Sequence, residues 1–496
     1  MASNDDTAVV DLGNPAHGGS VIARIDGQVV FVRGGVPGEK RVTIACDDAP
    51  VAASKKFRTA KVVSVERPSR HRVPGQCPAA AAGAGCCDLD FIDAEGSLEY
   101  KKMVVLDQLR RIGPLELGED QLEGIRLDPH THWRTRTRLG TEVTETSGAN
   151  GRDVQDVTVG LRKPKSRELV SVDDAACAQW TEELTDGVRR ALPEMIGATQ
   201  RSAGASGKTN SEIAVAVGDD GECGFEVVET TTTRRAKRGR GRGQRNRNRR
   251  ARTATSTTTI RPLGDLPTTV TRTLRLPRQG TALPGASENH NSGTTVTWRL
   301  PAHTFWQGHR AAAEAYARWV DAVIPPSTSD AATGWDLYGG SGVFSAVLAG
   351  KVAEVACVDV ASAATQVGES ALREAGIKSV RFVDADVARA LPTLAGDVAG
   401  APGEPGESAN VEATDPHGRE LHAVVLDPPR TGAGVDVVRA IAQCSPRHVV
   451  HIGCDPATAA RDLAAWVQQG YRIERIAAVD AFGLTHHVEV LAYLVR

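Results

Sequence analysis

A thiol and two carboxyl groups stand beside predicted strands in the last quarter of the chain. Cys454 follows an apolar strand and precedes a helix, whose amino terminus is expected to favour the thiolate. Glu489 stands just before the final strand, and Asp427-Pro-Pro-Arg430 follows another apolar run. The two prolines stiffen that turn and hold Asp427 and Arg430 at its edge. A nucleophile, a base and a stiff acidic turn on one cleft predict covalent catalysis.

These groups suit methylation of a weakly nucleophilic carbon such as C5 of uracil. The thiolate of Cys454 adds to C6 and makes C5 nucleophilic, and Glu489 removes the C5 proton after methyl transfer. A methyltransferase that acts on an exocyclic amine needs no thiolate. The presence of Cys454 therefore distinguishes methylation at carbon from methylation at nitrogen. An N-methyltransferase is also disfavoured because Arg430 follows the two prolines, where an aromatic residue is usual.

Glycines and acids end three successive predicted strands, as a nucleoside cofactor requires. Gly340 and Gly342 follow the first strand and allow a ligand to approach the backbone. Asp359 can accept two hydrogen bonds from a ribose diol, and Asp384 and Asp386 lie near the expected adenine. Because the loop lacks the full G-x-G-x-x-G spacing of a dinucleotide site, S-adenosylmethionine is the predicted cofactor. A flavodoxin-like domain with incidental acids is the alternative.

Helices and strands alternate from about Thr304 to the end of the chain. Helices are predicted at 310–323, 345–349, 362–375 and 435–442, and strands at 334–337, 352–358, 380–383, 423–426 and 448–452. Such alternation predicts an α/β fold with a parallel, doubly wound sheet, forming a Rossmann-like domain over residues 301–496. Its ligand is expected at the carboxyl ends of the strands.

Two further domains are predicted before this one. Residues 8–66 read as short strands, and Asp26-Gly27 between two apolar runs predicts a hairpin turn, so a small OB-like β-barrel is expected. Residues 67–300 are expected to form a central antiparallel α+β domain. Within it, Ser97 is predicted to cap a helix that runs to about Ile112. The alternating arginines of Trp133–Leu139 suggest a basic strand surface, with an ordinary solvated sheet face as the alternative.

The 496 residues carry a net charge of −2, which hides a concentrated basic tract. Residues 234–252 are rich in arginine and contain no acid, and the insertion 229–259 around them is predicted to be disordered and to contact RNA phosphates. A solvated loop is the alternative reading, and it is the expected one for a second insertion at 399–419. Without a long apolar run or a basic amino-terminal segment, the protein is expected to be cytoplasmic and outside the membrane. A monomer is expected because nothing in the sequence indicates a coiled coil or a symmetric interface.

Five segments, in order, resemble the bacterial RNA (uracil-5-)-methyltransferases over about residues 300–496. They are Phe305-Trp-Gln307, Leu337-Tyr-Gly-Gly-Ser-Gly342, Asp427-Pro-Pro-Arg-Thr-Gly432, Cys454-Asp-Pro-Ala-Thr458 and Thr485-His-His-Val-Glu489. Ala16-His-Gly-Gly19 is similar to the TRAM domain at the front of the ribosomal RNA members. The chain departs from the family at His309 and Asp455, where asparagine is usual.

The resemblance implies S-adenosylmethionine-dependent methylation of uridine C5 in RNA. The TRAM-like start and a group of cysteines favour 23S ribosomal RNA as substrate. The implied roles are cofactor and base binding for Gln307, Tyr338, Asp359 and Asp427, nucleophile for Cys454 and base for Glu489. It also implies that a helix from before the central domain joins the catalytic fold. A transfer RNA enzyme, and a non-catalytic RNA-binding protein with a methyltransferase fold, are the alternatives.

Three of the nine cysteines, Cys77, Cys86 and Cys87, lie close together in the sequence. In a reducing compartment this spacing predicts a metal site or catalysis rather than a disulfide scaffold. The resemblance implies a [4Fe–4S] cluster with Cys177 as the fourth ligand. Family members separate the second and third ligands as C-x-x-C, whereas Cys86 and Cys87 are adjacent, which is awkward for one cubane. Zinc with the same ligands is the alternative.

Overall fold

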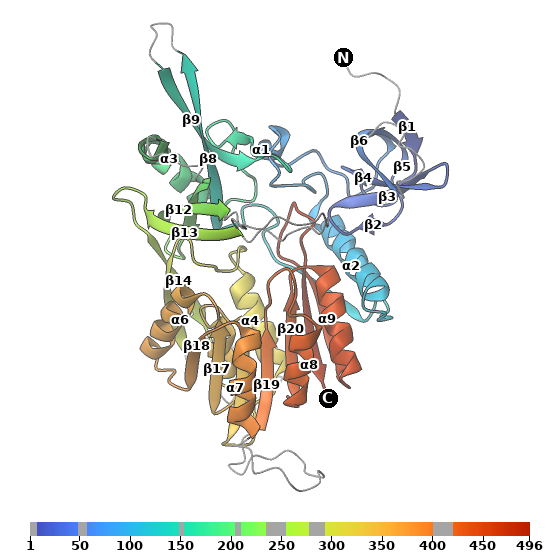
Figure 1. The fold of residues 1–496 in the computed structure, drawn as a ribbon. Coiled ribbons are helices and arrows are strands. Elements are labelled where there is room, and N and C mark those ends of the chain that lie inside the picture. Colours follow the sequence, from blue (N-terminus) through green and yellow to red (C-terminus); the bar gives the residue numbers. More distant parts are fainter. Residues whose placement is uncertain are drawn as a thin grey trace, which may run out of the picture.

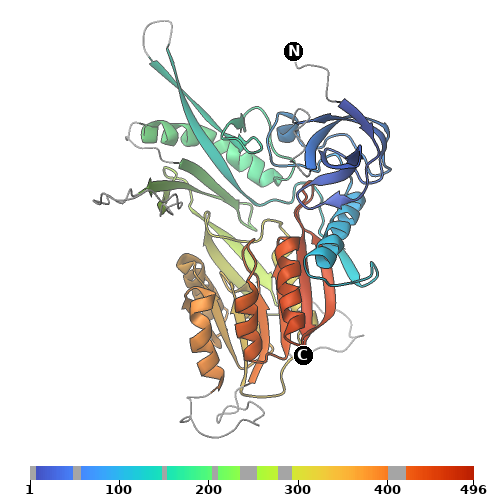
Figure 2. The same cartoon turned by 45° about the vertical axis from the view of Figure 1, so that its right-hand side comes forward.

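The computed structural model describes residues 7–47, 57–147, 153–203, 210–234, 254–276, 293–399 and 420–496. Within these ranges the strands form four sheets, and the largest is mainly C-terminal. Figures 1 and 2 show this sheet and its helices in the lower half of the molecule, with the N-terminal and central sheets above it. Among the described helices, none is long and apolar enough to cross a membrane. The predicted α/β class of the C-terminal part is confirmed.

The N-terminal sheet has six strands within the described residues, in the order β1-β5-β6-β4-β3-β2. Their bounds are β1 Thr7–Val10, β2 Pro15–Ala16, β3 Ser20–Ile25, β4 Gln28–Arg33, β5 Lys40–Cys46 and β6 Phe57–Arg67. Asp26 and Gly27 join β3 to β4 with φ angles of 49° and 81°, as the predicted hairpin requires. The apolar core of this sheet includes Tyr100 and Val104 of helix α2, Ala94–Arg111, so the helix is packed against it.

The central sheet has the strand order β10-β9-β8-β11-β12-β13 in the part of the chain that the structure describes. Its strands are β8 Arg136–Ser147, β9 Asp153–Arg162, β10 Leu169–Ser171, β11 Asn210–Val217, β12 Cys223–Arg234 and β13 Ala254–Pro262. Helix α3, Glu182–Ala203, packs on it through Leu184, Val188 and Met195. Helix α3 is not among the predicted elements, although these apolar residues recur at helical spacing.

The ends of the predicted disordered insertion 229–259 are ordered strands. Strand β12 continues to Arg234 and β13 begins at Ala254, and the two pair from Glu229–Thr259 outwards to Arg234–Ala254. Threonines dominate these ends, and their β-branched side chains favour strands. Residues 235–253, with most of the basic tract, and 400–419 of the second insertion lie outside the described residues.

Only one of the three arginines of the expected basic strand face, Arg138, is exposed to solvent. Strand β8 begins only at Arg136, whose Nη1 donates to the carbonyl oxygen of Trp306 at 3.2 Å. Arg134 Nε donates to Gln179 Oε1 at 2.7 Å, and both arginines are half-buried. Arg134 and Arg136 therefore join the central sheet to neighbouring loops, which strand periodicity alone does not indicate.

The C-terminal sheet has eight strands within the described residues, in the order β18-β17-β16-β19-β20-β22-β21-β7. Their bounds are β16 Ala332–Leu337, β17 Glu354–Asp359, β18 Val380–Asp384, β19 Glu420–Leu426, β20 His448–Gly453, β21 Arg472–Asp480, β22 Glu489–Val495 and β7 Leu122–Arg126. Strand β22 runs antiparallel to β20 and β21, and the pairs from β18 to β20 are parallel. The strands predicted in this region are present, with ends shifted by a few residues.

Helices cover both faces of this sheet because successive strand residues point to opposite sides. Val425 belongs to the core under α4 Ala312–Val323, α5 Val343–Leu348 and α6 Ser362–Glu374. Val424 belongs to the core under α2, α7 Val387–Ala399, α8 Val435–Gln443 and α9 Pro456–Gln468. A hairpin of β14 Thr269–Arg275 and β15 Thr295–Pro301 packs beside α6, and Trp298 Nε1 donates to the carbonyl oxygen of Ser341 at 2.8 Å.

Two elements of the predicted central domain pack with the C-terminal sheet. Strand β7 pairs in parallel with β21, and α2 lies against α9 (Figure 1), as the resemblance implies for a helix from this region. The cap of α2 is Asp93, whose Oδ1 accepts from the backbone nitrogen of Gly96 at 2.7 Å. The predicted cap Ser97 lies inside the helix and its Oγ donates to Asp480 Oδ2 at 2.7 Å. The helix starts earlier than predicted because Asp93 satisfies its first amides.

Candidate active site

The predicted catalytic and cofactor residues meet at the carboxyl ends of the parallel strands. Tyr338 follows β16, Asp359 ends β17, Asp427 follows β19 and Cys454 follows β20. Glu489 begins β22, which is antiparallel to β20 and so starts at the same edge. This is the edge at which doubly wound sheets bind their ligands.

The turn after β16 is built around the buried side chain of Asp336. Its Oδ2 accepts hydrogen bonds from the backbone nitrogen and Oγ of Ser345, each at 2.7 Å, which ties the turn to α5. Gly342 has a φ angle of 75°, and a Cβ there would lie 2.7 Å from the ring of Phe382. Position 342 therefore requires glycine both for its backbone conformation and for its packing.

Acidic residues from the next two strands flank this turn. Asp359 Oδ2 accepts from the backbone nitrogen of Gly340 at 3.0 Å, and its Oδ1 accepts from that of Ala361 at 2.7 Å. The remaining lone pairs of this fixed carboxylate can accept from ribose hydroxyls. Asp386 is exposed after β18, and its Oδ1 accepts from the backbone nitrogen of Arg389 at 3.3 Å. The hydrogen-bond acceptors along this edge fit the hydroxyl groups of a nucleoside.

Two further carboxyl groups lie near the cysteine. Asp427 Oδ2 accepts from Gln307 Nε2 at 3.3 Å. Burial, with a smaller contribution from Asp336, raises the pKa of Asp427 to about 7. Glu489 is buried, its Oε2 has no hydrogen-bond partner among the described residues, and burial and Asp427 raise its pKa well above the ordinary value. A buried carboxyl group with one unpaired oxygen and a raised pKa is suited to accept a proton.

The helix after Cys454 does not stabilise the thiolate as predicted. Helix α9 is capped by Asp455, whose Oδ1 accepts from the backbone nitrogens of Ala457 and Thr458, both at 3.0 Å. The free amides at the start of the helix are therefore bonded to a carboxylate rather than to sulfur.

His309, at the other position where the chain departs from the family, is buried and its ring stacks on that of Trp133.

Cys454 is half-buried and surrounded by acids. Burial, followed by the carboxylates of Glu489 and Asp427, raises the pKa of Cys454 to about 12, and Arg430 opposes this shift. The expectation of a thiolate is therefore wrong for the free protein. The sequence shows that Cys454 precedes a helix, but it does not show that Glu489 and Asp427 lie near the thiol. These acids come from other strands, and only the folded sheet brings them close enough to raise the pKa of Cys454.

Alkylation of Cys454 by iodoacetamide is expected to accelerate about tenfold per pH unit from pH 7 to pH 10, because only the thiolate reacts and its fraction grows tenfold per unit below the pKa. A free cysteine levels off above about pH 8.5. Mass spectrometry of the peptide that contains Cys454 measures the rate, with free cysteine in the same buffers as the reference. A plateau near pH 8 would contradict the raised pKa.

Helix α9 also holds the Asp-Pro-Pro-Arg turn in place. Thr458 Oγ1 donates to the carbonyl oxygen of Arg430 at 3.0 Å, and Arg461 Nη2 donates to that of Thr431 at 2.8 Å. Because Cys454 immediately precedes the cap of the same helix, the turn and the cysteine are fixed relative to each other.

A cavity of about 150 Å³ lies beside Cys454. It is lined by His17, Arg430, Cys454, Asp455, Pro456, His486 and His487. His17 Nε2 lies 3.1 Å from Asp455 Oδ2, so the N-terminal sheet reaches the catalytic edge. His17 is not among the predicted site residues, because only the packing of the N-terminal sheet brings it to Asp455. The glycine-rich motif Ala16-His-Gly-Gly19 is the one sequence signal that could have indicated a role for it.

The four predicted metal ligands come together in a second site. The Sγ atoms of Cys77, Cys86, Cys87 and Cys177 all lie within 4.8 Å of one another. The chain after Cys87 contacts the segment that leads to Glu489: the backbone nitrogen of Leu89 donates to the carbonyl oxygen of Leu484 at 3.0 Å. The second site therefore adjoins the candidate active site.

The strand order, the glycine turn and the acids at the strand ends define a class I methyltransferase fold of the S-adenosylmethionine-dependent type. Residues 288–496 match the model of the tRNA (uracil-5-)-methyltransferase family. A protein described as an uncharacterized RNA methyltransferase of Corynebacterium efficiens is 35% identical, over 99% of this chain and 95% of its own length. The chain belongs to the RNA (uracil-5-)-methyltransferase family, which confirms the resemblance.

Two other matches extend over nearly the whole chain. The 23S rRNA (uracil(1939)-C(5))-methyltransferase RlmD of Methylococcus capsulatus is 28% identical over 97% of this chain and 95% of its own length. The crystal structure of Pyrococcus abyssi tRNA (uracil-54, C5)-methyltransferase with S-adenosyl-L-homocysteine has a TM-score of 0.57 at 18% identity, covering 99% of this chain and 100% of that one. The structural match shows a shared fold.

Proposed function

We propose that this enzyme methylates C5 of a uridine in 23S ribosomal RNA through a covalent adduct on Cys454. The proposal rests on one observation: Cys454 and Glu489, with its unpaired buried oxygen, lie at the same edge of neighbouring strands. A methyltransferase that acts on nitrogen needs neither group. Two relatives named 23S rRNA (uracil(1939)-C(5))-methyltransferase, 28% and 25% identical, support ribosomal RNA as the substrate.

The proposed reaction uses the two side chains in turn. Cys454 first loses its thiol proton to solvent water. The resulting thiolate adds to C6 of uracil, so that an S–C6 bond forms and an electron pair moves towards C5 and O4. C5 then takes a methyl group from a sulfonium as the sulfur–methyl bond breaks. The carboxylate of Glu489 removes the C5 proton, and the released electron pair expels the Cys454 thiolate by breaking the S–C6 bond.

S-adenosylmethionine, when bound, supplies the electrophilic methyl group. The residues proposed to hold it are Gln307, Tyr338, Gly340, Gly342, Asp359, Asp386 and Asp427. The glycine turn leaves the backbone open to a ligand, Asp359 has lone pairs for a ribose diol, and the charge of Asp427 complements a sulfonium. These features of the chain fit the cofactor.

The cavity beside Cys454 is proposed to receive the target base after it leaves its stack. His17 from the N-terminal sheet and Arg430 from the Asp-Pro-Pro-Arg turn line this cavity, so RNA bound along the N-terminal sheet would present its base to Cys454. The basic residues 234–252 are proposed to add phosphate contacts. The enzyme is proposed to act as a monomer in the cytoplasm.

Methyl transfer from labelled S-adenosylmethionine tests both the product and the substrate. Ribosomal and transfer RNA from cells lacking the gene are incubated with the protein, digested to nucleosides and separated. We expect labelled 5-methyluridine from 23S ribosomal RNA. Label in transfer RNA alone would select the alternative substrate, and label on a nitrogen would contradict the mechanism. The absence of label in protein shown to bind the cofactor would favour a non-catalytic RNA-binding role.

A further inference from the structure

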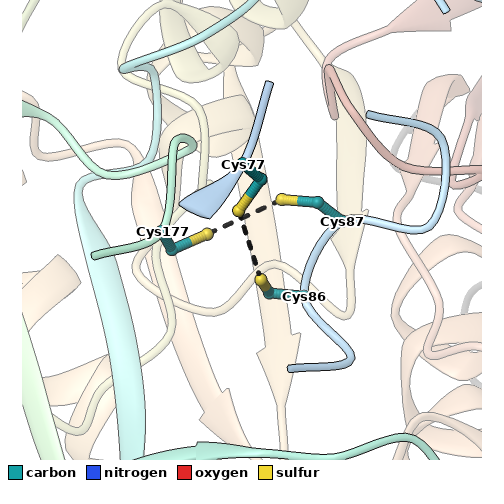
Figure 3. Close-up of side chains that lie close together, drawn as sticks. All are labelled: Cys77, Cys86, Cys87 and Cys177. Carbon is teal, nitrogen blue, oxygen red and sulfur yellow. Dashed lines mark hydrogen bonds between the residues drawn. The ribbon is translucent and has the colours of Figure 1, made fainter. Parts of the chain in front are cut away.

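The four cysteines of the second site point towards one centre (Figure 3). Cys77 caps the short helix α1, Pro78–Ala81, and Cys86 and Cys87 follow in the next loop. Cys177 comes from the loop between β10 and α3. The Sγ atoms of Cys77 and Cys86 are 3.7 Å apart, and so are those of Cys87 and Cys177. The adjacent residues Cys86 and Cys87 therefore both turn their sulfurs to the same point.

The spacing of these sulfurs distinguishes a single ion from a cluster. An ion with metal–sulfur bonds of about 2.3 Å at the centre of a tetrahedron needs sulfurs about 3.8 Å apart. The two 3.7 Å pairs agree with that edge length, and no two of the four Sγ atoms are more than 4.8 Å apart. In a cubane each thiolate binds a different iron atom, so the iron–sulfide framework holds the four ligand sulfurs farther apart. The residues do not fit the [4Fe–4S] cluster that the resemblance implies.

Hydrogen bonds around the sulfurs are those expected around thiolate ligands. The backbone nitrogens of Ala80 and Ala178 lie 3.4 and 3.5 Å from Cys77 Sγ. Gln179 Nε2 lies 3.2 Å from Cys87 Sγ, and Arg134 orients the Gln179 side chain through its Oε1. Donors of this kind stabilise and orient thiolate ligands in metal centres. Four thiolates around a divalent ion leave a charge of −2, which the nearby guanidinium of Arg134 partly offsets.

We propose that Cys77, Cys86, Cys87 and Cys177 bind one tetrahedral metal ion of the zinc class in a closed structural site. Four soft sulfur ligands in a tetrahedron select zinc over harder divalent ions. With all four positions filled by protein, the ion has no open position for a substrate and contributes to folding.

The proposed ion also anchors the segment that carries the candidate base. Asp88, directly after Cys87, accepts from the backbone nitrogen of His486 at 3.1 Å through Oδ1, and its Oδ2 contacts His486 Nδ1. The backbone nitrogen of Leu89 donates to the carbonyl oxygen of Leu484 at 3.0 Å. Ligand Cys87 is thus connected by short links to residues 484–489, and loss of the ion is expected to loosen them.

Metal analysis of protein purified without exposure to air from iron-supplemented cells tests the site independently of methylation. We expect about one zinc per chain and no acid-labile sulfide. Iron and sulfide in equal amounts, near four each per chain, would overturn the proposal. Exchange with Co²⁺ is expected to give the visible spectrum of tetrahedral cobalt with four thiolates in wild type. A spectrum of six-coordinate cobalt would also overturn it.

Two variants extend the test to the individual ligands. Cys86→Ala is expected to lose the metal, whereas Cys444→Ala, a half-buried cysteine at the end of α8, is expected to retain it. Retention of a full equivalent by Cys86→Ala would contradict the four-ligand site. If that variant does not fold, removal of the ion from wild type with a chelator serves instead. Amide exchange should then rise in residues 484–489 and stay unchanged in α8; equal protection with and without metal would exclude the anchoring role.

Discussion

Replacement of Cys454 by alanine is expected to lower the rate of methyl transfer by about 10⁴-fold or more. The loss is large because the nucleophile and the base act together, so that removing either one removes most of the catalysis. Without the sulfur, C5 of uracil is not activated, whereas the glycine turn and Asp359 are untouched. Binding of S-adenosylmethionine is therefore expected to stay at the wild-type level. Rates are measured with labelled methyl donor, and cofactor binding by calorimetry.

Covalent trapping provides the direct readout for this variant. RNA containing 5-fluorouridine has no C5 proton for Glu489 to remove, so wild type should form an adduct that survives denaturation, and Cys454→Ala should form none. Cys444→Ala is the matched control and should trap as wild type does, since it lies outside the cavity that contains Cys454. An adduct in Cys454→Ala would show that another residue is the nucleophile.

Replacement of Lys101 by methionine is expected to destabilise the protein by about 3–5 kcal/mol, because it leaves a buried carboxylate without its cation. The side chains of Lys101 and Asp480 are both 0% exposed and form an ion pair. Lys101 Nζ also donates to the carbonyl oxygen of Phe482 at 3.0 Å. The pair therefore joins α2 to the end of β21, where the segment leading to Glu489 begins.

Urea denaturation measures this loss of stability. Arg318→Ala breaks an exposed ion pair with Glu314 on α4 and is the control, with an expected cost within about 1 kcal/mol. The double variant Lys101→Met/Asp480→Leu removes both charges and is expected to recover much of the loss. A Lys101→Met protein as stable as wild type would show that the pair does not hold α2 on the sheet.

Local sequence patterns determined the elements of the catalytic region and the order of its reactive groups. Apolar runs and helical periodicity identified the five parallel strands from β16 to β20, although not β7 or β21 of the same sheet. Asp26-Gly27 identified a hairpin, because turn geometry depends on residues within a few positions. The carboxyl ends of parallel strands share one edge, so Asp359, Asp427 and Cys454 could be expected there together.

The protonation of Cys454, the lining of its cavity and the spacing of the four thiols were decided only by tertiary structure. Glu489 and Asp427 raise the pKa of Cys454 from other strands, and Asp455 takes the helix amides that the sequence alone offered to the thiol. Cys177 meets Cys87 across a separation of ninety residues. Electrostatic and metal-ligand contacts depend on distances in space, which periodicity along the chain does not determine.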